Sequence, residues 1–102
     1  MGKSIEVVLG RESFSKKGDV EVRIRTLIKS YQVMGFINGA DKELCLNLFK
    51  HHPSYTEKSG AGIEAIQVRL DEYGNRNFHL HRIDGTDEVI SWPKCLTSIK
   101  SS

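Results

Sequence analysis

The sequence predicts an α+β protein in which two to three helices pack on one face of a small, mostly antiparallel sheet. Two observations lead to this fold class. Apolar residues recur at the spacing of amphipathic helices in the N-terminal half, and three strand-like runs separated by turn residues follow in the C-terminal half. A chain of 102 residues can bury one modest core, so we expect a single domain over residues 1–102.

The composition is that of an ordinary folded protein. Hydrophobic residues make up 38% of the chain and charged residues 27%, which argues against the disordered and fibrous classes. No apolar run approaches the length of about 18 residues that a membrane-spanning helix needs, and the first residues lack the apolar stretch of a secretory signal. We therefore expect a cytoplasmic protein without a membrane segment, monomeric by default. A net charge of +2 permits contact with nucleic acid without arguing for it.

The N-terminal half predicts one short strand followed by two helices. The β-branched run at residues 4–9 is typical of a strand that would join the sheet. A helix over residues 16–31 comes next, and an extended connector over residues 33–37 leads to a second helix over residues 42–51, which Pro53 stops. The apolar stripe of the first helix comprises Val20, Ile24, Leu27, Ile28 and Tyr31, and that of the second comprises Leu44, Cys45, Leu48 and Phe49.

The C-terminal half predicts a three-stranded meander and a short helix. The expected strands are residues 63–70, 76–83 and 87–91, reached through a loop over residues 54–62. Asp84-Gly85 is a strong signal for a two-residue hairpin turn. The final helix begins at Ser91 and Pro93, and its apolar residues are Trp92, Cys95, Leu96 and Ile99.

The turns set a register for this meander. It places Ile66 opposite Leu80, Val68 opposite Phe78, and Leu80 opposite Val89, so that one side of the sheet is apolar in all three strands. At the edge of that side, Glu64 and Asp87 are expected opposite Arg82. The other side is expected to be polar and to present Gln67, Arg69, Asn77, His79, His81 and Glu88.

One stretch, from His52 to Cys95, carries a pattern of His-Pro, a Lys, Gly-x-Gly, Arg-x-Asp-Gly and Lys-Cys. In this pattern the chain resembles the DCL family, named for a plant "defective chloroplasts and leaves" protein and otherwise a domain of unknown function found in plants, bacteria and phages. It departs from the family where Asn77 replaces a frequent Cys and Ile90 replaces an aromatic residue. The matching positions are His52, Pro53, Tyr55, Lys58, Gly60, Gly62, Ile63, Val68, Phe78, Arg82, Asp84, Gly85, Ser91, Lys94 and Cys95.

The resemblance implies a role connected with RNA. Plant members are associated with plastid ribosomal RNA maturation, and a similar domain ends the largest subunits of the plant RNA polymerases that serve silencing. Bacterial and phage members have no assigned activity. The shared theme favours binding over catalysis.

Several residues of this stretch have two interpretations. Lys58 with Gly60 and Gly62 is either an anion site, because glycines let backbone N–H groups approach a phosphate, or a turn that needs positive φ. Arg82 is either a partly buried, paired residue or the partner of Lys58 and Lys94 in a basic cluster that contacts phosphate.

The histidines and cysteines, which are the residues best suited to metal binding or nucleophilic catalysis, do not indicate an enzyme. The four histidines lack the spacing of a zinc site, so we expect neither a metal nor another cofactor. We expect Cys45 and Cys95 to be buried, which leaves no evident nucleophile. His52 is expected to pack at the end of a helix.

The sequence therefore predicts a non-catalytic RNA-binding module or one associated with RNA processing or transcription. Lys58, Arg69, Arg82 and Lys94 would contact phosphates, and His79 and His81 would contact bases or ribose. The partner would be structured RNA or a protein of the RNA machinery. Two alternatives stay open: a protein-interaction module that docks on a polymerase or ribosome-associated partner, and a small metal-dependent nuclease.

Overall fold

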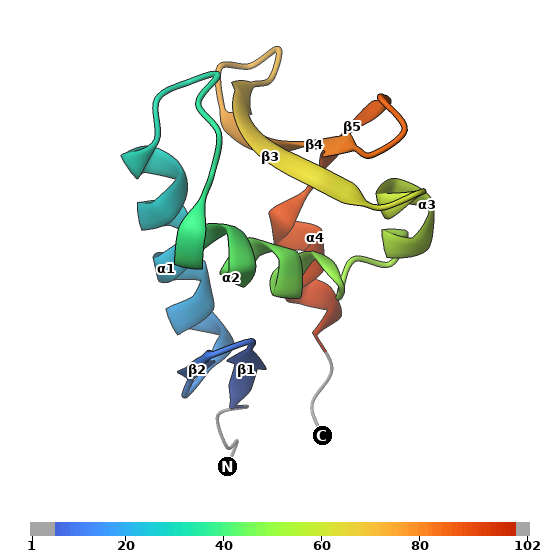
Figure 1. The fold of residues 1–102 in the computed structure, drawn as a ribbon. Helices are drawn as coiled ribbons and strands as arrows, with labels where there is room; N and C mark the ends of the chain where they lie inside the picture. The colour runs from blue at the N-terminus through green and yellow to red at the C-terminus, as the bar shows by residue number, and fades with distance from the viewer. Residues whose placement is uncertain (1–5, 100–102) are drawn as a thin grey trace.

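The computed structural model describes residues 6–99, which form two antiparallel sheets and four helices. Figure 1 shows the three-stranded sheet at one end of the molecule and a small hairpin at the other, with helices between them. The strands are β1 (Val7–Leu9), β2 (Glu12–Phe14), β3 (Ile63–Leu70), β4 (Arg76–Arg82) and β5 (Asp87–Ile90). The helices are α1 (Lys17–Ser30), α2 (Gly39–Phe49), α3 (Tyr55–Ser59) and α4 (Trp92–Ser98). The α+β prediction is confirmed.

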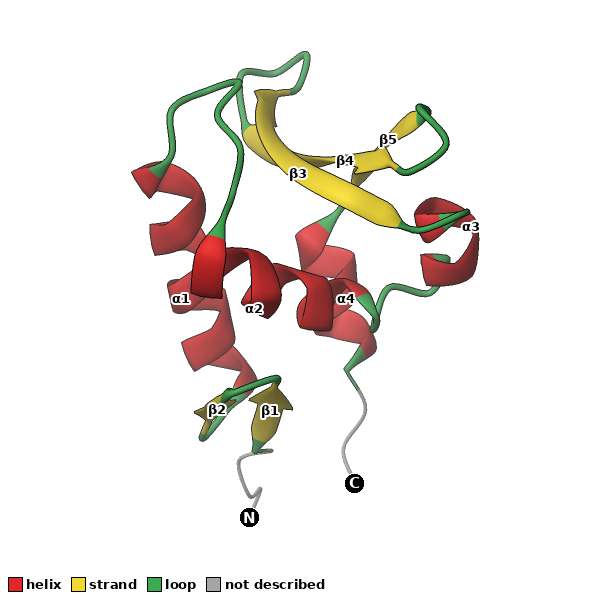
Figure 2. Ribbon diagram, viewed as in Figure 1, coloured by secondary structure: helices red, strands yellow, loops and turns green. Residues whose placement is uncertain are grey.

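The helices lie on one side of the three-stranded sheet, as expected, and Figure 2 shows α2 and α4 on that side. The core between them is apolar because most residues of the helix stripes and of one face of the sheet are buried, while Tyr31 and Leu96 are partly buried at its edge. Phe49 of α2 and Phe78 of β4 meet edge to face with ring centroids 5.4 Å apart. The core also contains Ile24, Leu27, Leu44, Leu48, Ile66, Val68, Leu80, Ile90 and Cys95. Within residues 6–99, none of the helices has the length and apolar character to cross a bilayer.

The predicted register is confirmed for the first hairpin of the meander and is wrong for the second. Ile66 lies opposite Leu80 and Val68 opposite Phe78, but Leu80 lies opposite Glu88 and not Val89. The reason is the turn after β4, in which Gly85 donates to the carbonyl of Arg82 and Arg82 donates to the carbonyl of Thr86. These bonds close a three-residue loop with Gly85 at positive φ, one residue longer than expected.

That one-residue slip exchanges the two faces of β5, because successive side chains point to opposite sides of a strand. Glu88 belongs to the helix side, and Asp87 and Val89 belong to the open side with His79 and His81. A register shift between Ile63 and Ala65 also places Ile63, not Glu64, opposite Arg82. The predicted placements of Glu64, Asp87 and Glu88 are therefore wrong.

The N-terminal strand was expected to extend the meander, but it forms a hairpin of its own. Val7–Leu9 pairs with Glu12–Phe14, and residues 4 and 5 of the predicted strand lie outside the described residues. The turn has positive φ at Gly10 but not at Arg11, as in a type II′ turn. The free edge of β3 is already occupied, since the connector before α2 bonds to it through Met34 N–H to Val68 O, 2.6 Å, and Ile37 N–H to Ile66 O, 2.9 Å.

Two short elements, β2 and α3, were not predicted from the sequence. Strand β2 lies in a polar stretch, and α3 occupies the predicted loop over residues 54–62. Helix α2 also begins three residues earlier than predicted, at Gly39. Elements of three or five residues are too short to show a period.

Candidate nucleic-acid interface

Arg82 lies at the end of β4 with a side chain that is only 14% exposed. Its Nη1 donates to the carbonyl of Lys58 at 2.8 Å, its Nε to Thr86 Oγ1 at 2.7 Å and its Nη2 to the carbonyl of Asp87 at 3.2 Å. The guanidinium therefore joins α3, β5 and the turn between β4 and β5. Its donors face protein acceptors, which supports the structural interpretation of this residue.

Lys58 is also used within the fold. Its Nζ donates to the carbonyl of Val89 at 3.0 Å and lies 3.6 Å from Glu88 Oε1. Because β5 is one residue out of the predicted register, Glu88 lies between Lys58 and Arg82 and offsets their charge. Lys94 is exposed on α4 and forms no ion pair with another of residues 6–99. Two residues of the predicted basic cluster, Lys58 and Arg82, are thus bonded within the fold, and only Lys94 is exposed and unpaired among residues 6–99.

The Gly-x-Gly element is a turn packed against the β4–β5 hairpin. Gly60 and Gly62 have positive φ, and their N–H groups donate to the carbonyls of Thr56 and Ser59. A Cβ at Gly60 would approach Arg82 Cδ at 3.0 Å, and one at Gly62 would approach Ile83 Cδ1 at 2.7 Å. Positive φ favours glycine at both positions, and neither N–H is free for an anion.

The other motif residues support the chain locally. Asp84 Oδ1 accepts the Thr86 N–H at 3.0 Å, and the hydrogen bonds from Thr86 lower the pKa of Asp84. Ser91 accepts the Lys94 N–H at the start of α4, as its predicted capping role requires. Cys45 and Cys95 are both fully buried, and burial raises the pKa of the Cys95 thiol to about 12 and that of Cys45 as well. Neither thiol is a nucleophile at neutral pH.

His52 is buried just after α2, before Pro53, and its Nδ1 accepts the Ser54 N–H at 2.9 Å. Nδ1 is therefore unprotonated and Nε2 carries the hydrogen. Burial first, then the positive charges of Lys58 and Lys94, lower the pKa of His52 below its ordinary 6.5. Both lysines therefore lie near enough to His52 for their charges to disfavour its protonation.

Lowering the pH is expected to destabilise the protein through His52. A folded-state pKa below the unfolded one means that the unfolded chain binds the proton more readily. The stability that neutral His52 provides is complete above about pH 6.5 and is lost as the pH falls toward its folded-state pKa. Chemical denaturation between about pH 7.5 and 5 should show a steeper loss for the wild type than for His52→Gln. The pKa of His51 is lowered too, by burial, but His51 titrates in both proteins and cancels. Parallel curves would contradict the assignment.

The remaining predicted site residues, Arg69, His79 and His81, share the open side of the three-stranded sheet. Gln67 organises them: its Oε1 accepts from Arg69 Nε at 2.8 Å and from His81 Nε2 at 2.9 Å, while its Nε2 donates to the Met34 carbonyl. This fixes the ring orientation of His81.

Asp87 extends the same network across β5. Its carboxylate bonds to His79 Nε2 and lies 3.9 Å from Arg69 Nη1. The hydrogen bond from His79 is the main reason that the pKa of Asp87 is lowered. Asp87, which was predicted on the apolar side of the sheet, therefore offsets part of the positive charge on the open side.

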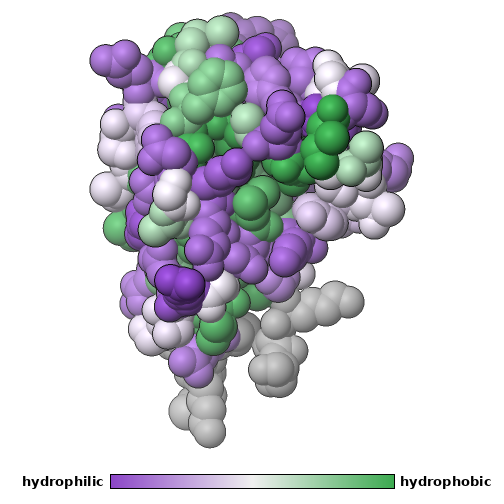
Figure 3. Space-filling view, in the orientation of Figure 1, coloured by the Kyte–Doolittle hydropathy of each residue, from purple (hydrophilic) through white to green (hydrophobic). Residues whose placement is uncertain are grey.

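Phe36 completes a row of rings on this side of the sheet. Its ring centroid lies 5.5 Å from that of His81, which lies 5.8 Å from that of His79. Phe36 is 52% exposed, although it belongs to a connector that pairs with Gln67 of β3. Figure 3 shows hydrophobic side chains reaching the surface among polar ones in the upper half of the molecule, where the connector and sheet lie.

The sequence did not single out Phe36 as a site residue. The one available signal was an aromatic residue within a run that looked extended, since the contact with His81 joins segments far apart in the chain. We call Phe36, His81, His79 and Arg69 the open-face row. Within residues 6–99, no three His, Cys, Asp or Glu side chains are grouped to hold a metal ion.

Comparison with known proteins identifies the family of this chain. Residues 25–96 match the model of a family described as "Protein of unknown function (DUF3223)". The chain belongs to this family. A solution NMR structure of an uncharacterized protein from Rhodospirillum rubrum has the same fold, with a TM-score of 0.83, 27% identity and coverage of 93% of this chain and 91% of that one.

One curated relative is a subunit of an RNA polymerase. The chain is 32% identical over 99 residues to DNA-directed RNA polymerase IV subunit 1 of Arabidopsis thaliana. The match covers 93% of this chain but spans only 7% of that subunit's length. This similarity agrees with the predicted likeness to plant RNA polymerase subunits.

Proposed function

We propose that this member of the DUF3223 family is a non-catalytic RNA-binding module whose open-face row binds single-stranded RNA. The observation that supports this most is the set of three rings, from Phe36, His81 and His79, held side by side on a sheet with Arg69 next to them. Single-stranded RNA is bound in this way by other sheets, since unstacked bases pack on aromatic side chains while cations contact the backbone.

The network around Gln67 supports the proposal further. It holds His81 in one orientation before any ligand arrives, which reduces the entropy lost on binding. The similarity to an RNA polymerase subunit is consistent with a partner that carries RNA. Assignment to the DCL family, a part in ribosomal RNA processing and a cytoplasmic location belong to the same proposal in its finer form.

Removing the ring of Phe36 is expected to weaken RNA binding. Fluorescence anisotropy with a short single-stranded RNA at low ionic strength should show about a fivefold or greater loss for Phe36→Ala and His81→Ala, the loss of one stacked base each. Tyr73→Ala is the matched control, because Tyr73 is an exposed aromatic residue in the β3–β4 turn, outside the row. Wild-type binding should also weaken as salt is added. Absence of binding at low salt, or equal effects of all three variants, would contradict the proposal.

A protein partner is the second candidate, and the likeness to an RNA polymerase subunit favours it. Phe36 and Val89, which are both exposed, offer apolar contact area on the same side. If the RNA titration shows no binding at low salt, the protein-docking role becomes the favoured one.

Catalysis has no part in the proposal, because both thiols are buried and no three His, Cys, Asp or Glu side chains among residues 6–99 are grouped to hold a metal ion. RNA and DNA incubated with the protein and Mg²⁺, Mn²⁺ or Zn²⁺ are expected to stay intact. Cleavage with any of these ions would overturn the non-catalytic assignment and favour a metal-dependent nuclease.

A further inference from the structure

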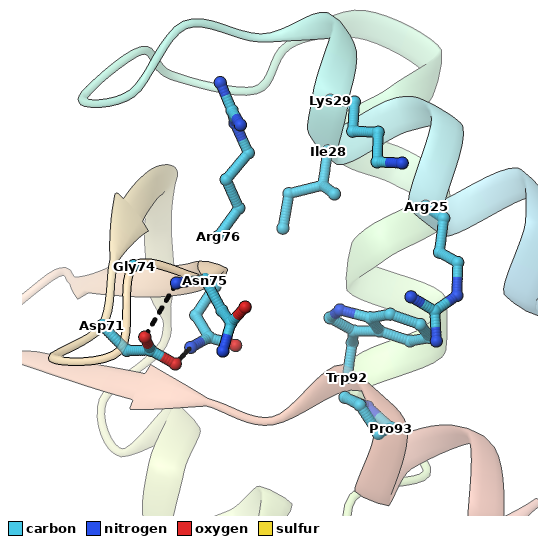
Figure 4. A pocket seen from close by; sticks show the side chains of 10 residues that line it. Arg25, Ile28, Lys29, Asp71, Gly74, Asn75, Arg76, Trp92 and Pro93 are labelled. Carbon is cyan, nitrogen blue, oxygen red and sulfur yellow. Dashed lines mark hydrogen bonds between the residues drawn. The ribbon is translucent and has the colours of Figure 1, made fainter.

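A cavity of about 440 Å³ lies away from the motif residues, between α1, the β3–β4 turn and the start of α4. Figure 4 shows Arg25, Ile28 and Lys29 on one side of it, Arg76 and Asn75 on another, and Trp92 at its base. Its size is within the range of about 300–1,000 Å³ that small-molecule sites occupy. We call it the basic cleft.

Three positively charged side chains, Arg25, Lys29 and Arg76, line the basic cleft. Arg25 is paired with Glu21, whose Oε2 lies 2.9 Å from Nη2. Lys29 and Arg76 form no ion pair within residues 6–99. Two cations from two different elements, neither of them paired with a carboxylate of residues 6–99, therefore line one hollow, which is an arrangement that attracts an anion.

The one carboxylate among the lining residues is occupied by its own turn. Asp71 Oδ1 accepts the N–H groups of Tyr73 and Asn75 at 2.8 and 2.9 Å, and its Oδ2 accepts from Asn77 Nδ2 at 2.9 Å. These bonds, the one from the Asn75 backbone above all, lower the pKa of Asp71. Its acceptors are used, so it holds the wall of the cleft in shape.

Trp92 adds an N–H donor that no other side chain or carbonyl of residues 6–99 uses. Its side chain is more than nine-tenths buried, and the guanidinium of Arg25 lies over its ring, 5.4 Å from the centroid. No hydrogen bond joins its Nε1 to another of residues 6–99, and no enclosed side-chain nitrogen or oxygen among them lacks a partner, so this N–H opens into the cleft. Figure 4 shows the indole nitrogen on the edge of the ring that faces Asn75, across the hollow.

We propose that the basic cleft binds a terminal phosphate monoester, such as that of a 5′ nucleotide. A monoester has about −1.5 to −2 charge and three free oxygens, which matches two uncompensated cations and one indole donor. Figure 4 draws the Arg76 guanidinium at the end of its side chain away from Trp92, so binding requires the exposed side chains of Arg76 and Lys29 to turn toward the phosphate. The planar fork of Arg76 then suits two phosphate oxygens, Lys29 supplies a point charge, and the Trp92 N–H supplies the third contact. A backbone phosphodiester has one charge and two free oxygens and fits this set less well.

The basic cleft is independent of the open-face row. Its cations and its indole come from α1, the start of β4 and α4, and none of the four residues of that row lines it. Phosphate binding here would therefore persist in a Phe36→Ala protein even if the proposed RNA surface were lost.

The test is calorimetric titration of the full chain with four probes: inorganic phosphate, AMP, and two RNA oligonucleotides of one sequence that differ only in a 5′-phosphate or 5′-hydroxyl. AMP or the 5′-phosphorylated RNA is expected to bind, and Arg76→Gln should weaken that binding at least about tenfold, as the loss of a charged, bidentate contact. Lys50→Gln is the control with the same change of charge, on an exposed residue at the end of α2.

Trp92→Phe tests the indole donor, since it removes the N–H and keeps an aromatic ring. It should weaken binding while thermal unfolding shows that the protein stays folded; Arg76→Gln, on an exposed side chain, decides the question if Trp92→Phe does not fold. Equal binding of AMP and phosphorylated RNA identifies a nucleotide site, and preference for the RNA identifies a strand-end site. Binding of no probe, equal binding of the two oligonucleotides, or no difference between Arg76→Gln and Lys50→Gln would overturn the proposal.

Discussion

Replacing Phe78 with alanine is expected to lower the free energy of unfolding by about 3–5 kcal/mol, among the largest effects that one substitution can have in this protein. Phe78 is fully buried at the centre of the sheet and packs edge to face on Phe49, 5.4 Å between centroids. Removing the ring loses the transfer free energy of its carbons and leaves a cavity that α2 and the sheet cannot fill without distortion.

Urea denaturation monitored by circular dichroism measures this effect, and Phe36→Ala is the matched control. The same truncation on the open side of the sheet removes a ring that is 52% exposed, so it should cost less than about 1 kcal/mol. Equal losses for the two variants would mean that Phe36 is as much a part of the core as Phe78, which would remove it from the candidate RNA surface.

Replacing Arg82 with methionine is expected to lower the free energy of unfolding by about 2–3 kcal/mol. The guanidinium donates to the carbonyls of Lys58 and Asp87 and to Thr86, and its loss leaves those acceptors without a partner. Glu88 would also lose one of its two neighbouring cations. The expected result is a loosened contact between α3 and the β4–β5 hairpin.

The same variant distinguishes the two interpretations of Arg82. Lys94→Met, an equal change on an exposed residue, is expected to alter stability by less than about 0.5 kcal/mol. If Arg82→Met left the denaturation midpoint unchanged and instead weakened RNA binding with a smaller salt slope, Arg82 would be a phosphate contact and our structural interpretation would be wrong.

Much of the fold was predictable because it rests on local patterns. The limits of β3 and the start of β5 agree with the structure to the residue, and the helix stripes of α1 and α2 are buried as expected. The register of β3 on β4 was also right from Ala65 to Leu70, where a three-residue loop with Gly74 at positive φ joins the two strands. A periodic pattern states which face is buried without reference to distant residues.

The errors arise where one residue more or less has a large consequence. Asp84-Gly85 is compatible with a two-residue and a three-residue loop, and the structure has the longer one. That single residue moved Glu88 next to Lys58 and Arg82 and placed Asp87 beside His79. It thereby decided which basic residues are neutralised, which the sequence pattern alone does not state.

The sequence by itself determined the fold class, the buried faces of the long elements and the general nature of the motif, because each depends on neighbours within a few residues. Only the tertiary structure decided what the motif residues contact. It showed that Lys58, Arg82 and the two glycines hold α3 against the hairpin. It also brought Phe36 into contact with His81 and placed Arg76 and Trp92 around one cleft, from segments far apart in the chain. These arrangements form only when the whole chain folds, so no local sequence pattern could have predicted them.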